Sequence, residues 1–309
     1  MKIMSGDYTS WNPLQDRTWC TIGVFDGVHR GHQAILGALR DRAGSEPVGV
    51  ITFRQHPLAE LRPDAAPPML ASLDQRLEVL EDLGVDAVAV LDFPQVRELS
   101  PTDFVTTIVS GLMNAAHLAV GQGFRFGHEM AGNEETLQEL GGAYGFDVEI
   151  LDIVGGSSPV RSTVIREALA SGDVVSAAAM LGRPFQLRGG VVQGDQRGRQ
   201  LGFPTANLEI ETGRALPGRG VYSAITTIGD GTRRPSVVNV GVRPTFGEFA
   251  EVAEVHLLDA TLYLYGQELS VDFVDRIRSE RRFSGVDELV EQIGRDIETA
   301  RLQLEAHAG

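Results

Sequence analysis

The order of strand-like and helix-like segments constrains this chain most, because that order changes near residue 184. Before this point, apolar β-rich runs alternate with runs of helical spacing. The predicted strands are 19–25, 47–53, 85–93 and 116–124, and the predicted helices between them are 31–43, 74–84 and 100–113. Asp74 is expected to cap the second of these helices, and Ser100 followed by Pro101 to begin the third. Regular alternation predicts an α/β domain, a parallel sheet with helices on both faces. Ligands of such sheets bind beyond the carboxyl ends of the strands.

Beyond residue 184 the chain is dominated by short β-rich runs separated by Gly and Pro. The predicted strands are 185–195, 204–210, 220–228, 235–242, 253–266 and 268–278. This pattern is typical of a small closed β-barrel. The amphipathic run 285–308 predicts a C-terminal helix that packs on the barrel. We therefore expect two domains, 1–184 and 185–309, joined at a hinge of Gly182–Pro184.

The charge of the chain restricts its partners. The sequence has 27 Lys and Arg against 42 Asp and Glu, a net charge of −15, and no Lys/Arg-rich run. This argues against nucleic-acid binding but allows a nucleotide, since a phosphate site needs only local amides and one or two cations. The single cysteine, Cys20, excludes an intramolecular disulfide and a multi-cysteine metal site. With no signal-peptide core and no membrane-length apolar run, we expect a soluble cytoplasmic protein without a membrane partner.

The stretch "GVFDGVHRGH" (23–32) lies where the first strand gives way to a helix. His29 and His32 share a face if the helix has begun, and Gly27 and Gly31 allow close approach of a ligand. Free amides at a helix N-terminus favour an anion, so two imidazoles there suit a phosphoryl centre. The alternatives for such a histidine pair are a metal site or satisfied surface side chains.

The stretch "GDQRGRQLGFPTANLEI" (194–210) combines regularly spaced glycines with Arg197 and Arg199. Such a loop can fold over phosphates, although the spacing is not that of a Walker motif. Thr205 and Asn207 are two apart, so on an extended segment their oxygens face the same way and suit Mg²⁺. The alternative is a turn followed by an ordinary edge strand.

Glu254 lies in a predicted strand with alternating apolar neighbours. A carboxylate near Mg²⁺ and an alcohol can act as general base in phosphoryl transfer. The alternative is a solvated strand glutamate.

Taken together, these motifs resemble a known family. "GVFDGVHRGH" resembles the signature of the HxGH nucleotidyltransferases, whose domain is Rossmann-like. "GDQRGRQLGFPTANL", "NVGVRPTFGE", "EVHLLD" and "VDFVDRIRSERRF" resemble, in this order, the riboflavin kinase module. The chain is therefore similar to the bacterial bifunctional riboflavin kinases/FAD synthetases over nearly its whole length. The resemblance implies an FMN adenylyltransferase domain at 1–184 and a riboflavin kinase domain at 185–309.

The resemblance also implies roles for individual residues. Glu254 would activate the terminal hydroxyl of riboflavin, and His29 and His32 would bind the triphosphate and stabilise the transition state of adenylyl transfer. Thr205 and Asn207 would hold Mg-ATP. The implied nucleotide-binding residues are Gly23, Phe25, Asp26, Gly27, Ser162, Thr163, Arg166, Gly194, Arg197, Gly198, Thr205 and Asn207. Flavin is then substrate and product, Mg²⁺ arrives with ATP, and no permanent cofactor is expected.

Three short stretches of the first domain depart from the family pattern. Arg54 and Gln55 replace Asp-Pro after the second strand, Gly123 replaces Asn or Asp, and Arg161 replaces Ser in "RSTVIR". Gly123 lacks a side chain that could bond a ligand, and Arg161 adds a cation. Three hypotheses follow. The chain has both activities; it is a kinase whose first domain is weak, silent or adapted to another nucleotide or flavin analogue; or it is a non-catalytic flavin-binding regulator.

Overall fold

A computed structural model describes residues 1–151, 160–194, 198, 201–244, 249–260 and 262–308. The contacts within the chain divide it into two compact units, Met1–Ser162 and Thr163–Gly309. The division predicted at residue 184 concerns the two catalytic domains and stays a prediction.

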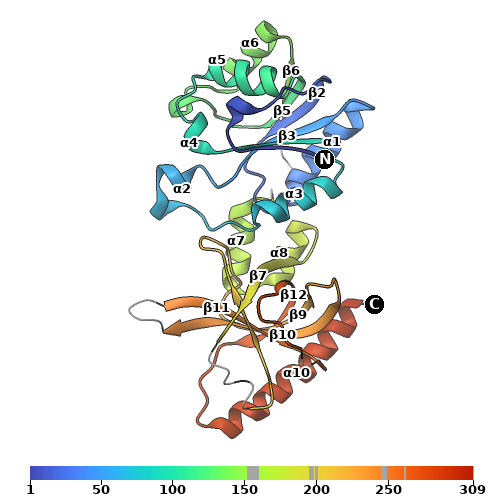
Figure 1. Ribbon diagram of the computed structural model, residues 1–309, viewed down its shortest axis with the longest axis vertical. Coiled ribbons are helices and arrows are strands. Elements are labelled where there is room, and N and C mark those ends of the chain that lie inside the picture. Colours follow the sequence, from blue (N-terminus) through green and yellow to red (C-terminus); the bar gives the residue numbers. More distant parts are fainter. Residues whose placement is uncertain (152–159, 195–197, 199–200, 245–248, 261, 309) are drawn as a thin grey trace. The chain divides into compact units, whose positions relative to one another are not determined.

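The first unit is built on a six-stranded parallel sheet with the order β1-β4-β3-β2-β5-β6 (Figure 1). Its strands are β1 (Lys2–Ser5), β2 (Thr18–Ile22), β3 (Val48–Phe53), β4 (Ala87–Leu91), β5 (Ala115–Gly121) and β6 (Asp147–Leu151). The predicted parallel sheet is confirmed. The two edge strands, β1 and β6, were missing from the sequence prediction.

Helices cover both faces of this sheet, as predicted. One apolar cluster joins β2, β3 and β4 to the helical residues 104–113 and to α6, and a second joins the same strands to α1 and α3. The α-helices are α1 (Arg30–Ala43), α2 (Leu58–Leu61), α3 (Leu73–Asp82), α4 (Phe93–Val96), α5 (Pro101–Phe104) and α6 (Glu134–Tyr144). The other helical turns are η1 (Tyr8–Ser10), η2 (Asp26–Val28), η3 (Pro63–Ala65), the π-helical η4 (Val105–Leu112) and η5 (His128–Met130).

The ends of two helices test the predicted capping residues. Ser100 caps α5 with Pro101 in its first turn, as predicted. The predicted cap of α3 at Asp74 is wrong, because the helix begins one residue earlier. Ser72 is its N-cap and forms a capping box with Gln75. The Ser72 hydroxyl accepts from the Gln75 amide, and the Gln75 side chain accepts from the Ser72 amide. This pair satisfies two free backbone donors at the start of the helix, which favours Ser72 over Asp74 as the N-cap.

The second unit is a closed antiparallel barrel with the strand order β10-β11-β8-β7-β12-β9, which confirms the predicted barrel. Its strands are β7 (Phe185–Val192), β8 (Ala206–Glu209), β9 (Gly220–Thr227), β10 (Arg233–Pro244), β11 (Phe249–Leu257) and β12 (Glu268–Ser279). Helices α7 (Ser162–Ser171) and α8 (Val174–Leu181) precede the barrel. The guanidinium of Arg276 ties the end of α7 to it, donating to Ser171 O at 2.8 Å.

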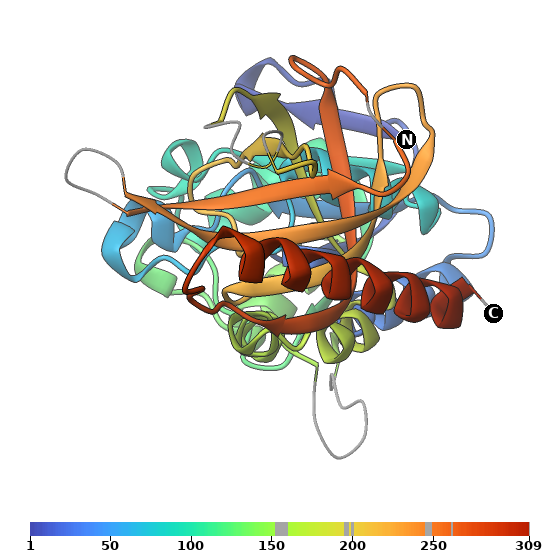
Figure 2. The ribbon, with the colours of Figure 1, turned by 90° about the horizontal axis from the view of Figure 1, so that it is seen from below.

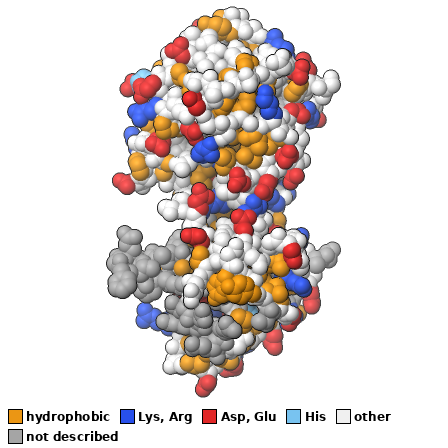
Figure 3. All heavy atoms as spheres, viewed as in Figure 1, with side chains coloured by type: hydrophobic (Ala, Val, Ile, Leu, Met, Phe, Trp, Pro, Cys, Tyr) orange, Lys and Arg blue, Asp and Glu red, His pale blue; other side chains and the backbone are white. Residues whose placement is uncertain are grey.

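The chain ends in the predicted helix, α10 (Val286–Ala308), which crosses the outside of the barrel (Figure 2). Ile297 and Ala300 of this helix pack against Val221 and Val237 of the barrel wall. On the visible face of each unit, Lys and Arg side chains are interspersed with acidic ones and form no continuous basic surface (Figure 3). Within the described residues, no helix combines the length and apolar character needed to cross a membrane.

Candidate active sites

The turn between β2 and α1 carries the two predicted histidines. Phe25, Gly27 and Val28 adopt positive φ angles of 51°, 75° and 40°. This tight left-handed path turns the chain from the carboxyl end of the strand and places His29 as the N-cap of α1. A non-glycine residue adopts positive φ only at some cost, and such strain gathers at functional sites.

The imidazoles of His29 and His32 stack, with ring centroids 3.8 Å apart and planes within 17°. The His32 ring also contacts the Phe25 ring, with the two ring centroids 4.7 Å apart. A Cβ at Gly31 would lie 3.1 Å from two ring atoms of His29, so the glycine makes room for the stack. Burial, and then the neighbouring His29, hold the pKa of His32 well below its usual value, so this ring is neutral.

The site has the features of an anion site more than those of a metal site. Both rings stand at the first turn of α1, where the helix presents free amides. The described part of the chain contains no group of three His, Cys, Asp or Glu side chains arranged to hold a metal ion.

Asp26 supports the turn from behind. It is 2% exposed, and its carboxylate accepts from the Leu70 and Ala71 amides at 2.8 and 3.3 Å. Its carbonyl accepts from Ser162 Oγ at 3.2 Å. These contacts fix the loop before α3 against the turn, so the carboxylate is engaged with backbone. The predicted contact of Asp26 with a nucleotide stays a prediction, as do those of Gly23, Phe25, Gly27 and Ser162.

Arg76 of α3 is a supporting residue that the sequence prediction missed. It is 1% exposed, yet its guanidinium donates to Val24 O and Phe53 O, each at 2.9 Å, and to Arg54 O at 2.6 Å. These carbonyls lie where β2 and β3 end, next to the histidine turn. A buried Arg with several carbonyl acceptors fixes the relative position of the two strand ends.

The three unusual residues have different surroundings. Arg54 donates to Asp92 Oδ1 and to Ser5 Oγ, each at 2.7 Å, so its charge is paired at the sheet edge. Gly123 has φ +81°, its amide donates to Glu134 Oε1, and a Cβ there would meet nothing within 4 Å. Arg161 is exposed, and nothing in the structure explains it.

Two further predicted residues, Thr163 and Arg166, lie on α7, whose residues from Thr163 onward belong to the second compact unit. Thr163 is exposed and Arg166 is half-buried. Their predicted contacts with the nucleotide stay predictions.

An apolar cavity of about 640 Å³ opens beyond the carboxyl ends of β2, β3 and β4 in the first unit. Its walls are mainly apolar, and Arg97, Arg125, His128 and Glu129 stand among its lining residues. The phenylalanines that line it are Phe53, Phe93, Phe104, Phe124 and Phe126. The Phe53 and Phe93 rings meet edge to face with centroids 6.0 Å apart. Such a cavity suits a flat aromatic ligand.

In the second unit, the register of the barrel brings Asn207 and Glu254 together. The two residues pair directly between the antiparallel strands β8 and β11, although they are far apart in sequence. Asn207 is 6% exposed, and Glu254 is half-buried. Ala253 and Val255 on either side of Glu254 are fully buried, so Glu254 lies on the other face of β11. Thr205 immediately precedes β8, and its contact with a metal ion stays a prediction.

The glycine-rich stretch is partly described. Gly198 is required by a close turn, since a Cβ there would lie 2.4 Å from Phe203 O, and Phe203 N donates to Gly198 O at 2.8 Å. Gly202 adopts φ +89°. Gly194 follows β7 and is half-buried. Arg197 and Arg199 lie outside the described residues, so their predicted role in closing on the nucleotide stays a prediction.

A cavity of about 450 Å³ opens beside Thr205 at one end of the barrel. Its lining includes Pro204, Val255, Leu257, Tyr263 and Tyr265. It is large enough for a planar base and lies next to the predicted phosphate-binding loop.

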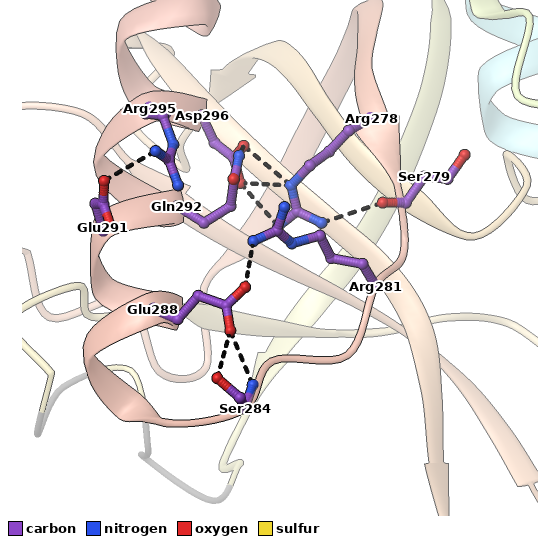
Figure 4. A network of polar contacts seen from close by, with 9 residues as sticks. All are labelled: Arg278, Ser279, Arg281, Ser284, Glu288, Glu291, Gln292, Arg295 and Asp296. Atoms are coloured by element: carbon purple, nitrogen blue, oxygen red, sulfur yellow. Dashed lines mark hydrogen bonds and ion pairs between the residues drawn. The ribbon is translucent and has the colours of Figure 1, made fainter.

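Polar contacts fix the segment between β12 and α10 (Figure 4). Arg278 Nε donates to both carboxylate oxygens of Asp296 at 3.0 Å, and Asp296 is 2% exposed. Arg281 donates to Glu288 Oε1 at 2.8 Å, and Ser284 donates to Glu288 Oε2 through its amide and hydroxyl. The hydrogen bonds from Ser284 lower the pKa of Glu288.

Comparisons with known proteins agree on both units. Residues 12–164 match the FAD synthetase family model and residues 181–304 the riboflavin kinase model. A bifunctional riboflavin kinase/FMN adenylyltransferase of Escherichia coli strain K12 is 39% identical over 306 residues, 97% of each chain. The protein of that description from Pseudomonas fluorescens is 42% identical over 91% of each chain.

One solved structure also matches along nearly the full length. It is described as a macrolide-efflux protein from Streptococcus pneumoniae, with a TM-score of 0.86 and 30% identity. The match covers 97% of this chain and 99% of that one.

Proposed function

The chain belongs to the bifunctional riboflavin kinase/FMN adenylyltransferase family, and on that premise we propose which residues carry out each reaction. It phosphorylates riboflavin to FMN with ATP and then transfers AMP from ATP to FMN, which gives FAD. The observation that carries the assignment is the pairing of Asn207 with Glu254 in one unit and the His29–His32 stack in the other.

Glu254 acts as the general base of the kinase reaction. Its carboxylate takes the proton of the terminal ribityl hydroxyl as that oxygen attacks the γ-phosphorus of ATP. The bond from the γ-phosphorus to the β–γ bridging oxygen breaks, and ADP leaves. The half-buried position of Glu254 on the outer face of β11 supports this role, since the strand holds the side chain in place while a substrate hydroxyl can still reach it.

Asn207 and Thr205 bind the Mg²⁺ that accompanies ATP. The amide oxygen of Asn207 and the hydroxyl of Thr205 are hard donors of the kind Mg²⁺ takes. Asn207 is 6% exposed and stands opposite Glu254, so a phosphate held there lies beside the base. The cavity beside Thr205, with Tyr263 and Tyr265 in its wall, receives the adenine.

His29 and His32 serve the adenylyl transfer. A phosphate oxygen of FMN attacks the α-phosphorus of ATP, the α–β bridging bond breaks, and pyrophosphate leaves without a covalent enzyme intermediate. His32 Nδ1 is buried and has no hydrogen-bond partner among the described residues, so a phosphate oxygen or water would satisfy it. Because the pKa of His32 is lowered, the ring stabilises charge as a neutral hydrogen-bond donor.

The aromatic cavity of the first unit receives the isoalloxazine ring of FMN. It lies at the carboxyl ends of β2, β3 and β4, and β2 is the strand that leads into the histidine turn. Aromatic walls suit a flat tricyclic ring, and the arginines among the lining residues suit an anionic ligand.

Two substitutions test the assignments in the full-length protein with riboflavin, Mg²⁺ and ATP. Glu254→Gln lowers FMN formation by about 10²–10⁴-fold and leaves conversion of supplied FMN to FAD intact. His29→Ala lowers FAD formation by about 10²–10³-fold and leaves FMN formation intact. Loss of both activities in either variant would contradict the division of labour.

Matched controls come from residues of the same type outside the two sites. Glu209→Gln changes an exposed glutamate of β8, and His117→Ala removes a histidine that stacks on Trp19 near the start of β5. Both should keep both activities. Replacing ATP with other nucleoside triphosphates in the second reaction tests whether the first unit prefers another nucleotide. Riboflavin that is bound but unchanged would indicate a non-catalytic flavin-binding protein.

A further inference from the structure

A polar row runs across the outer face of the barrel beside Glu254. Strand pairing places Asn207 opposite Glu254, and Glu254 opposite Asn239 of β10. The register continues from Asn239 to Val221 and from Val221 to Arg278. Directly opposed residues share one face with Cβ atoms about 4.5–5.5 Å apart. Glu254 is therefore flanked by an amide on each side, and only Asn207 has an assigned role so far.

Asn239 is half-buried, and its carboxamide forms no hydrogen bond with the protein within the described part of the chain. The strand residues before and after it, Val238 and Val240, are at most 2% exposed and face the barrel interior. The amide thus stands on the face of the catalytic carboxylate with donors and an acceptor available to a ligand.

Gly241, two residues after Asn239 on β10, leaves space beside the Asn239 carboxamide. Gly241 has no side chain, and a Cβ there would lie 3.6 Å from Asn239 Nδ2 and 3.4 Å from Glu280 Oε1. The Asn239 amide and the Glu280 carboxylate therefore approach the same point above β10. Glu280 lies between Arg278 and Arg281, whose ion pairs with Asp296 and Glu288 fix this segment to α10 (Figure 4).

We propose that Asn239 is a substrate-binding residue of the kinase site, whose carboxamide hydrogen-bonds a secondary hydroxyl of the ribityl chain next to the terminal hydroxyl that Glu254 deprotonates. This rests on the assignment of Glu254 as the base. The ribityl chain carries a hydroxyl on each of several adjacent carbons. With its terminal hydroxyl at Glu254, the chain can place the next hydroxyl at Asn239 on the neighbouring strand. An amide suits a hydroxyl as donor and as acceptor, and the Glu280 carboxylate accepts from a further one.

The test pairs enzyme variants with substrates that each lack one ribityl hydroxyl. Asn239→Ala lowers kcat/KM for riboflavin by about 3–10-fold, the effect of one hydrogen bond. The same variant and the unaltered protein use one particular deoxy analogue equally, because the bond is already absent. Gln186→Ala, which removes an amide of β7 bonded to Asp272, leaves kcat/KM unchanged with every substrate.

The split between kcat and KM is a readout that a merely structural residue would not change. The bond holds the ribityl chain of bound riboflavin, so Asn239→Ala raises KM for riboflavin more than it lowers kcat. Conversion of supplied FMN to FAD, which belongs to the other unit, stays constant in all variants. If Asn239→Ala is unstable, Asn239→Leu, which keeps much of the side-chain volume without the amide, takes its place and should also match the unaltered protein on one particular deoxy analogue.

The outcomes separate the two proposals. Full kinase activity in Glu254→Gln would overturn the assignment of the base. Loss of activity in Glu254→Gln, with equal effects of Asn239→Ala on riboflavin and on every deoxy analogue, would overturn the role of Asn239 alone.

Discussion

Replacing Arg76 with Met should destabilise the first unit and slow adenylyl transfer while leaving the kinase reaction unchanged. The side chain lies in the apolar side of α3, and Met fills much of the same space. What Met cannot supply is the set of donors to Val24 O, Phe53 O and Arg54 O. These carbonyls lie at the ends of β2 and β3, and the histidine turn follows β2.

The magnitude follows from the contacts. The Val24 carbonyl keeps a second donor, Thr52 Oγ1 at 3.0 Å, so two carbonyls lose the contact that Arg76 provided. A hydrogen bond from a charged donor contributes about 1.5–3 kcal/mol, so the free energy of unfolding falls by about 3–6 kcal/mol. At roughly 2–4 °C per kcal/mol for a unit of this size, Tm of the first unit falls by roughly 6–24 °C. Arg76→Lys keeps the positive charge and can donate in one direction, so its Tm should lie between those of the unaltered protein and Arg76→Met.

Tryptophan fluorescence measures this unit alone, because the chain has 2 tryptophans and both, Trp11 and Trp19, lie in it. The denaturation midpoint followed by this signal should fall, whereas FMN formation at 25 °C should match the unaltered protein. Adenylyl transfer should lose kcat, and KM for FMN should rise with it, since Val24 and Phe53 border both the histidine turn and the aromatic cavity. An unchanged midpoint together with unchanged FAD formation would refute the reasoning.

Two other substitutions in the first unit test the unusual glycine and the buried imidazole. Gly123→Asn adds a polar side chain at φ +81°, a conformation that Asn tolerates, and a Cβ there would meet nothing within 4 Å. One hydrogen bond gained to the substrate should raise kcat/KM for FMN by about 2–10-fold. An unchanged kcat/KM would mean that a side chain at this position does not contact the substrate. The lowered folded pKa of His32 means that the unfolded chain takes up the proton first, so the free energy of unfolding should rise with pH up to about 6.5 and then level. Denaturation followed by fluorescence between pH 5 and 7 should show a shallower slope for His32→Gln, and an equal slope would contradict a buried neutral ring.

The sequence pattern predicted the elements whose apolar residues are buried on a regular period. The buried runs of β2, β3, β4 and β5 and the alternating strands of the barrel all stood out. The edge strands did not, because β1 (Lys2–Ser5) buries one residue of four and β6 (Asp147–Leu151) buries none fully. An edge strand presents one side to solvent, so its composition resembles that of a loop.

The site residues likewise divide into those that a local sequence pattern could place and those that it could not. His29 and His32 are neighbours on one turn, so their spacing already predicted their proximity. Asn207 and Glu254 met only through barrel register, which no local pattern specifies. Arg76 could have been found, because it occupies a position of the apolar stripe that Leu73, Leu77 and Leu80 define on α3. The aromatic cavity could not, since each of its phenylalanines alone is typical of a core residue.

The structure also explains how the first unit accommodates its departures from the family pattern. An Asp at position 54 would place a second carboxylate beside Asp92, whereas Arg54 forms an ion pair there at 2.7 Å, so Arg54 and Asp92 form a matched pair. Gly123 suits the positive φ of its turn without strain. The histidine stack draws its support from Asp26, Arg76 and Gly31, and Arg76 reaches position 54 through the backbone carbonyl of Arg54, which any residue presents. The contact of Arg76 that supports the histidine turn therefore does not depend on which side chain stands at position 54.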